Sequence, residues 1–126
     1  MNNIIFQELS EKVIGLAFTV HNILGPGLLE SAYEEGMCWE LKHAGIPFQR
    51  QQVFPLLYKG DYISSYFTDI VVDNKVILEL KSVSKFNELM AAQLLNYLKL
   101  SHIPVGYLIN FNCISVQFKR YVCQRE

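Results

Sequence analysis

Apolar residues recur every three or four positions in the first part of the chain, and this spacing predicts two helices. The first is expected over residues 11–24, with Ser10 as its N-cap. It should end at Gly25-Pro26-Gly27, because glycine adopts the left-handed backbone of a helix end and proline cannot continue the helix. A second helix is predicted over residues 29–44, ending before Gly45.

Beyond residue 47 the pattern becomes that of strands. A short apolar run at 53–58 is followed by a turn at 59–61, and two further strands are expected before residue 82. Residues 88–100 then predict a helix so apolar on nearly every side that it should be largely buried. Two last strands are expected at 104–111 and 114–122. We therefore predict an α/β (α+β) fold in the order ααβββαββ, with helices flanking a mixed central sheet.

Length and charge narrow the function classes. The 126 residues suit a single domain spanning 1–126, and the formal net charge of -1 excludes recognition of nucleic acid through bulk positive charge. No signal peptide and no apolar run long enough for a membrane span are evident, so we expect a cytoplasmic protein without membrane contact. The three widely spaced cysteines predict buried or half-buried apolar residues in place of disulfides or a zinc site.

The segment TDIVVDNKVILELKS at 68–82 places charges among apolar strand residues. Because side chains alternate along a strand, Glu79 and Lys81 should project from one face. A two-residue loop in this hairpin would pair Asp69 with Leu78, whereas a three-residue loop over 73–75 would pair it with Glu79. We favour the second register, which would bring the β-carbons of Asp69 and Glu79 to about 5 Å from each other.

Two neighbouring carboxylates repel one another unless a cation neutralises them. Mg²⁺ prefers oxygen ligands and often uses one or two carboxylates, so Asp69 and Glu79 are candidate ligands. Lys81 could hold a nucleophilic water and offset the charge that develops in phosphodiester hydrolysis. A Glu-x-Lys sequence on a strand is also common as a simple solvated face, and that reading stays open.

Two helical pairs could add to this face. Gln93 and Tyr97 lie four residues apart on the apolar predicted helix, and Glu30 and Tyr33 lie three apart at the start of the second. Either pair could orient a carboxylate, a water or a phosphate. Ordinary structural roles, such as hydrogen bonds to backbone, are the alternative for both pairs.

The ordered motifs Gly27-x-x-Glu30-x-x-Tyr33, Asp69, Glu79-x-Lys81 and Gln93-x-x-x-Tyr97 resemble those of the GxxExxY family, which is placed in the PD-(D/E)XK nuclease superfamily. The resemblance covers nearly the whole chain. It implies a restriction-endonuclease-like core and a Mg²⁺-dependent nuclease site, with Mn²⁺ as a substitute. On that basis Asp69 and Glu79 would bind the metal, Glu30 would ligate or support it, and Lys81 would be the catalytic lysine. Gln93 and Tyr97 would position substrate.

Three functions follow as hypotheses. The first is a metal-dependent phosphodiesterase, a hydrolase acting on DNA in preference to RNA. The second is a catalytically silent module that retains the nuclease fold and binds nucleic acid or protein. It is motivated by the near-neutral charge and by Phe67, which stands where many relatives have a basic residue. The third is a subunit that is active only as a homodimer or with a partner.

Overall fold

The predicted order of helices and strands is confirmed. A computed structural model describes residues 5–123, and within them the chain forms helices and strands in the order ααβββαββ. The elements are α1 (Gln7–Leu24), α2 (Glu30–His43), β1 (Phe48–Tyr58), β2 (Asp61–Val72), β3 (Val76–Lys81), α3 (Glu88–Ser101), β4 (Val105–Asn110) and β5 (Gln117–Val122).

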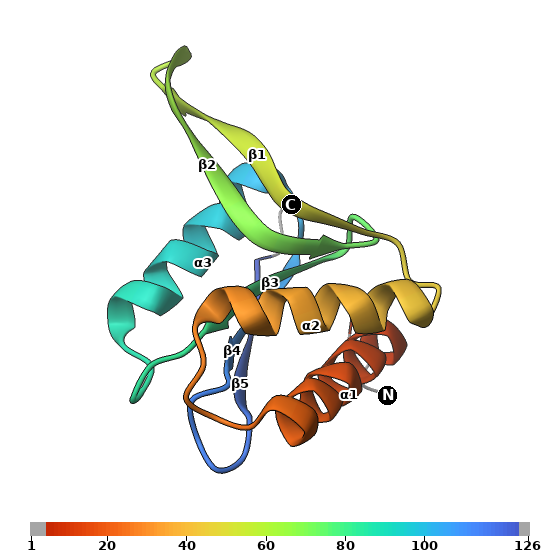
Figure 1. Cartoon of the computed structure of the whole chain (residues 1–126). Coiled ribbons are helices and arrows are strands. Elements are labelled where there is room, and N and C mark those ends of the chain that lie inside the picture. The colour runs from red at the N-terminus through yellow and green to blue at the C-terminus, as the bar shows by residue number, and fades with distance from the viewer. Residues whose placement is uncertain (1–4, 124–126) are drawn as a thin grey trace.

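The five strands form one mixed sheet in the order β1-β2-β3-β4-β5. Neighbouring strands are antiparallel except β3 and β4, which run parallel and are joined through α3. Two parallel strands require such a crossover, because the chain must return to the end of the sheet at which the first strand began. The β1–β2 hairpin is twisted and extends beyond the rest of the sheet on the side of α3 (Figure 1).

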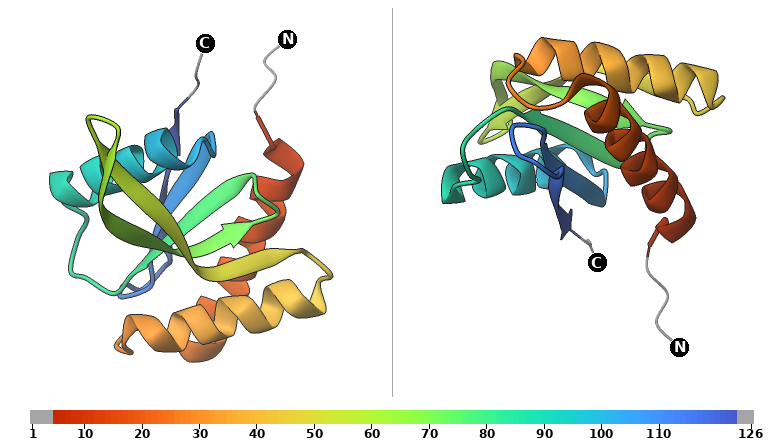
Figure 2. Two further views of the ribbon diagram at one scale, coloured as in Figure 1. Left: turned by 90° about the horizontal axis from the view of Figure 1, so that it is seen from above. Right: turned by 60° about the horizontal axis from the view of Figure 1, so that its bottom comes forward.

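Helices cover both faces of the sheet, with α1 and α2 on one face and α3 on the other (Figure 2). An apolar core lies on each face of the sheet, and the side chains of β3 alternate between the two cores, as the sequence predicted. Val76, Leu78 and Leu80 join the core with α1 and α2. Ile77 lies in the core beneath α3, together with Leu94. Glu79 and Lys81 lie two and four residues after Ile77, so their side chains project from the same face of β3, the side of α3.

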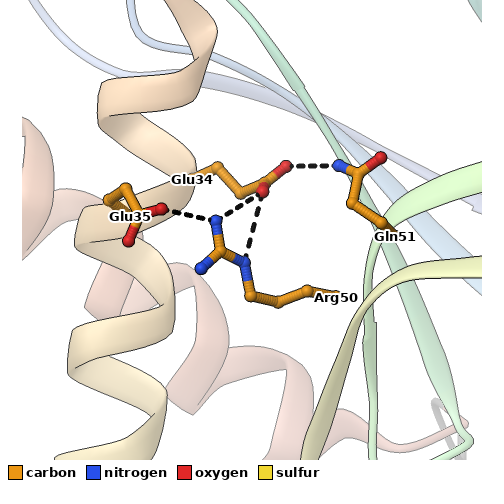
Figure 3. Close-up of polar contacts among 4 residues, drawn as sticks. All are labelled: Glu34, Glu35, Arg50 and Gln51. Carbon is orange, nitrogen blue, oxygen red and sulfur yellow. Dashed lines mark hydrogen bonds and ion pairs between the residues drawn. The ribbon is translucent and has the colours of Figure 1, made fainter.

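A charged cluster joins α2 to the start of β1 (Figure 3). The guanidinium of Arg50 lies 2.8 Å from a carboxylate oxygen of Glu34 and 2.7 Å from one of Glu35. The side-chain amide of Gln51 donates to the other oxygen of Glu34 at 2.8 Å. These bonds hold the first half of the projecting hairpin against the helix.

Several predicted boundaries were wrong. The first helix begins at Gln7, and Ser10 is a buried residue within it whose hydroxyl accepts a hydrogen bond from Arg120. The first strand begins at Phe48, five residues before the apolar run, because the polar residues Gln49, Arg50 and Gln52 pair with β2. The last strand begins at Gln117, and Ile114 is 98% exposed in the preceding loop.

The expectation that residues 88–100 form a largely buried helix was also wrong. Within α3 only Leu94 and Leu98 are buried, whereas Leu89, Leu95 and Leu100 are exposed. The helix contacts the sheet along one side only. The three exposed leucines therefore face outward or line a cleft between α3 and the β1–β2 hairpin.

The cysteine and membrane expectations have separate outcomes. Cys38 is buried and the other two cysteines are half-buried, and all three are free thiols, as predicted. Among residues 5–123, no helix is both long and apolar enough to span a membrane.

Candidate active site

The turn between β2 and β3 sets the register on which the site depends. Val72 pairs with Val76 and Ile70 pairs with Leu78, leaving the three residues 73–75 in the loop. Asp73 and Asn74 have positive φ angles of 50° and 53°, a conformation that these two residue types tolerate better than most. The paired residues end at Ile70 and Leu78, and one more step in the same register sets Asp69 opposite Glu79. The three-residue loop is therefore confirmed.

The Asp69 carboxylate reaches across to the neighbouring strand. Its Oδ2 accepts a hydrogen bond of 2.8 Å from the backbone N–H of Leu80. Leu80 directly follows Glu79, so the bond fixes Asp69 beside the other carboxyl. The two acidic side chains are thus held together by the backbone of the hairpin.

Glu79 is the more deeply buried of the two acids, with 4% of its surface exposed. Its Oε1 is buried and has no hydrogen-bond partner among the described residues. The pKa of Glu79 is raised to about 9: burial raises it most, the charge and side chain of Asp69 also raise it, and Lys81 and the backbone of Asp69 lower it. Without a cation, Glu79 is therefore protonated at neutral pH.

Lys81 ends β3 and is half-buried. It stands two residues after Glu79 on the same side of the strand, and its charge acts on the Glu79 carboxyl. The backbone after it is anchored by Asn110, a fully buried residue of β4 that pairs with Lys81. The Asn110 amide donates to the carbonyl of Val83 at 2.9 Å and accepts from its N–H at 3.1 Å.

Glu30 approaches the same strand end from α2, but it does not join the acidic pair. Its Oε2 accepts a hydrogen bond of 3.2 Å from the backbone N–H of Ser82, and the Ser82 hydroxyl donates to the carbonyl of Leu28 at 2.6 Å. Across residues 5–123, no three acidic, histidine or cysteine side chains are grouped closely enough to hold a metal ion. The structure brings together Asp69 and Glu79, with Glu30 bound to the adjacent backbone.

Tyr33, the last residue of the Gly27-x-x-Glu30-x-x-Tyr33 motif, has a structural role in the loop before α2. Its buried hydroxyl donates to the carbonyl of Gly25 at 2.7 Å and accepts from the N–H of Leu28 at 3.1 Å. Its ring stacks on Phe111, with centroids 4.5 Å apart. Gly27 has φ of +95°, which L side chains rarely adopt. Tyr33 therefore shapes the loop that starts α2 beside Ser82, and is not itself directed at the acids.

Gln93 and Tyr97 on α3 have different surroundings. Tyr97 is half-buried, and its pKa is raised by burial and then by the charges of Glu79 and Asp69, which places it near the acidic pair. Its ring stacks on Tyr66 of β2 with centroids 4.5 Å apart. Gln93 is exposed and lines a cleft next to Tyr97.

His21 of α1 lies a few residues before the Gly27-x-x-Glu30-x-x-Tyr33 motif and has a structural role. It is buried, and its Nε2 lies 2.7 Å from the carbonyl oxygen of Cys113. The interaction ties α1 to the loop between β4 and β5.

The acidic pair has the chemistry of a divalent-cation site. Two carboxyl groups lie side by side, and one carries a buried oxygen without a partner. A hard cation with oxygen ligands would satisfy that oxygen and offset both the burial and the repulsion by Asp69 that keep Glu79 protonated. Mg²⁺ commonly uses one or two carboxylates and retains several waters, so a third protein carboxylate is not required.

Sequence reasoning did not find Asn110, Tyr66 or Ser82. Asn110 looks like an ordinary residue at the end of a strand, and its role depends on a parallel pairing that brings together residues 29 positions apart. Tyr66 lies in a strand with many aromatic residues. Only the β2–α3 packing distinguishes it from the others.

Comparisons with known proteins bear on the fold and on the sequence family. The chain is similar to SSO0001, whose crystal structure aligns with a TM-score of 0.56 at 18% identity, covering 96% of this chain and 60% of that one. The likeness concerns the fold, and this chain spans about 60% of the length of SSO0001. No curated protein sequence matches the chain. The sequence model of the PD-(D/E)XK nuclease superfamily matches residues 7–121, which include all the site residues described above, and the chain belongs to this superfamily.

Proposed function

We propose that this protein is a Mg²⁺-dependent nuclease that hydrolyses phosphodiester bonds in DNA, and that it belongs to the GxxExxY family within the superfamily. The observation that carries the proposal is the register of the β2–β3 hairpin, which aligns Asp69 with Glu79 and leaves a buried Glu79 oxygen without a partner. Superfamily membership supports a nuclease. The domain would comprise the whole chain, residues 1–126.

Asp69 and Glu79 would hold the cation. When bound, Mg²⁺ or Mn²⁺ would polarise the phosphate and make a coordinated water more acidic. Asp69 is already oriented by the Leu80 N–H, so little reorganisation is needed on its side. Glu79 must lose its proton to act as a ligand, because a neutral carboxylic acid binds a metal cation much more weakly than a carboxylate does.

Lys81 would act on the reacting phosphate. Its ammonium projects from the same face as Glu79 and would orient the attacking water and offset negative charge developing on the phosphoryl oxygens. Glu30 would support the metal through water, since its carboxylate is already bound to the Ser82 N–H. Gln93 and Tyr97 would position the substrate from α3.

A cleavage assay tests this proposal. We expect Mg²⁺- or Mn²⁺-dependent cutting of plasmid or single-stranded DNA, reduced by a factor of about 100 or more in Asp69→Ala, Glu79→Ala and Lys81→Ala. Lys85→Ala, an exposed lysine four residues further on, is the matched control and should retain activity. A folded protein that cuts nothing in either metal would contradict the proposal.

The second candidate is a catalytically silent binding module with the same fold. It is favoured by the grouping of two carboxylates in place of three and by Phe67, which is 58% exposed beside Asp69. Salt-sensitive DNA binding without cleavage, unchanged in Lys81→Ala, would support it over the nuclease. An obligate homodimer would show a mass of two chains in light scattering.

A further inference from the structure

A cleft lies between α3 and the projecting β1–β2 hairpin, next to the acidic pair. Its volume is about 560 Å³, within the range of about 300–1,000 Å³ that is usual for ligand sites. One wall comes from the hairpin and the other from α3. Figure 1 shows where these two elements lie. The residues that line it are Leu56, Tyr66, Leu89, Ala92, Gln93, Asn96, Tyr97, Lys99 and Leu100.

Two of the residues that line the cleft, Tyr66 and Tyr97, belong to a series of three aromatic rings. Tyr66 stacks on Tyr97 with centroids 4.5 Å apart and planes at 10°, and Phe54 stacks on Tyr66 at 5.4 Å and 20°. These three rings therefore make a nearly parallel series from β1 through β2 to α3. Stacked, flat apolar surfaces of this kind favour flat aromatic ligands over flexible chains.

The Tyr66 hydroxyl indicates that the ligand has a polar edge. Tyr66 is only 9% exposed, and its hydroxyl has no hydrogen-bond partner among the described residues. Burial raises its pKa to about 12, so the group remains an O–H donor at neutral pH. A buried hydroxyl without a partner costs free energy that a ligand acceptor would recover. The side-chain amides of Gln93 and Asn96 add further donors and acceptors at the α3 wall.

Tyr97 is the residue that relates the cleft to the acidic pair. That ring lines the cleft, and its hydroxyl is influenced by the charges of both Glu79 and Asp69. A ligand stacked in the cleft therefore lies beside the place where we propose that a phosphate is cut.

We propose that this cleft binds an unpaired base of single-stranded nucleic acid, which stacks on Tyr97 at the end of the ring series while a polar group of the nucleotide accepts from the Tyr66 hydroxyl. The sugar-phosphate on one side of that base then extends toward Asp69, Glu79 and Lys81. The inference rests on the proposed function and narrows its substrate class to an unpaired strand. A base within a duplex would first have to be unpaired, unstacked and flipped out, which weakens binding.

Equilibrium binding tests this inference without cleavage. Fluorescence anisotropy would measure binding of a fluorescein-labelled thymidine 12-mer and of a blunt 12-base-pair duplex, in EDTA, to the full chain. We expect the single strand to bind at least tenfold more tightly. Tyr97→Leu, which removes one ring and keeps the helix, should weaken binding about 5- to 150-fold, the range for one lost base stack.

Two tyrosine variants form a matched pair. Tyr66→Phe deletes only the buried hydroxyl and should weaken single-strand binding several-fold without loss of stability. Tyr62→Phe deletes a hydroxyl from the same strand, where Tyr62 is exposed and contacts Ser65, and should leave binding unchanged. Circular dichroism melts would verify that each variant is folded.

The outcomes separate this inference from the proposed function. Equal binding of single strand and duplex, or unchanged binding in both Tyr97→Leu and Tyr66→Phe, would overturn the inference even if the protein cuts DNA. Absence of oligonucleotide binding together with a two-chain mass that Tyr97→Leu reduces to one would also overturn it, because the cleft would then hold a second copy. Single-strand binding with the expected variant effects but no cleavage would uphold the cleft and contradict the nuclease.

Discussion

Replacing Glu79 by Gln should change how the stability of the metal-free protein depends on pH. The folded protein holds a proton on Glu79 up to a pKa of about 9, whereas an unperturbed glutamate loses it near 4.5. Between these values the folded state binds one proton more than the unfolded state. Stability from this group is thus fully present below about pH 4.5 and is lost as pH rises through 9. The slope is about -1.4 kcal/mol per pH unit.

Urea denaturation in EDTA at pH 6, 7 and 8 would measure this effect. Over those two pH units, wild type should lose about 3 kcal/mol of unfolding free energy relative to Glu79→Gln, whose amide has no proton to lose. Comparing two variants at each pH cancels the contribution of the three histidines. Glu11→Gln, an exposed carboxyl on α1, is the matched control and should run parallel to wild type. Parallel profiles for wild type and Glu79→Gln would refute the reasoning.

Three other substitutions test how the scaffold holds the site. Asn110→Ala removes the side chain that bonds both backbone groups of Val83, so we expect a loss of about 2–4 kcal/mol in urea denaturation; a change below about 0.5 kcal/mol would contradict this role. Tyr33→Phe keeps the ring stack but deletes the hydroxyl bonded at Gly25 and Leu28, and should cost about 1–2 kcal/mol in the same assay. Gly106→Ala should cost about 1–3 kcal/mol, because its β-carbon would lie 2.8 Å from a leucine side chain of α3. Its control, Gly15→Ala in α1, meets nothing within 4 Å and should be neutral or stabilising in thermal melts, so equal effects at the two glycines would show that crowding is not the cause.

The parts of the fold that could be predicted were those determined locally. Turn residues and alternation in 68–82 were sufficient to predict which β3 residues face each core and to favour the correct loop length. The turn works because Asp73 and Asn74 accept positive φ, a property of the residues themselves. The metal-binding and catalytic roles proposed for Asp69, Glu79 and Lys81 rest on that register and stay a prediction.

Other features depend on contacts that one segment cannot reveal. Ser10 is a residue type that favours N-cap positions, yet it lies within α1, where its hydroxyl accepts a hydrogen bond from Arg120, 110 residues later. The apolar helix α3 is half-exposed because the projecting hairpin stands apart from it across a cleft. Glu30 could be placed near the site by its motif. Its hydrogen bond from the Ser82 N–H could not be predicted, because the two residues are 52 positions apart and meet only in the folded chain.

The most direct test of the metal-site account is anomalous diffraction from crystals soaked in Mn²⁺ above pH 8, where loss of the Glu79 proton is easiest. The account predicts one anomalous peak between the carboxylates of Asp69 and Glu79, and no peak there in Glu79→Gln. Wild-type crystals with no peak at this pair, or with Mn²⁺ bound elsewhere while the protein still cuts DNA, would contradict it.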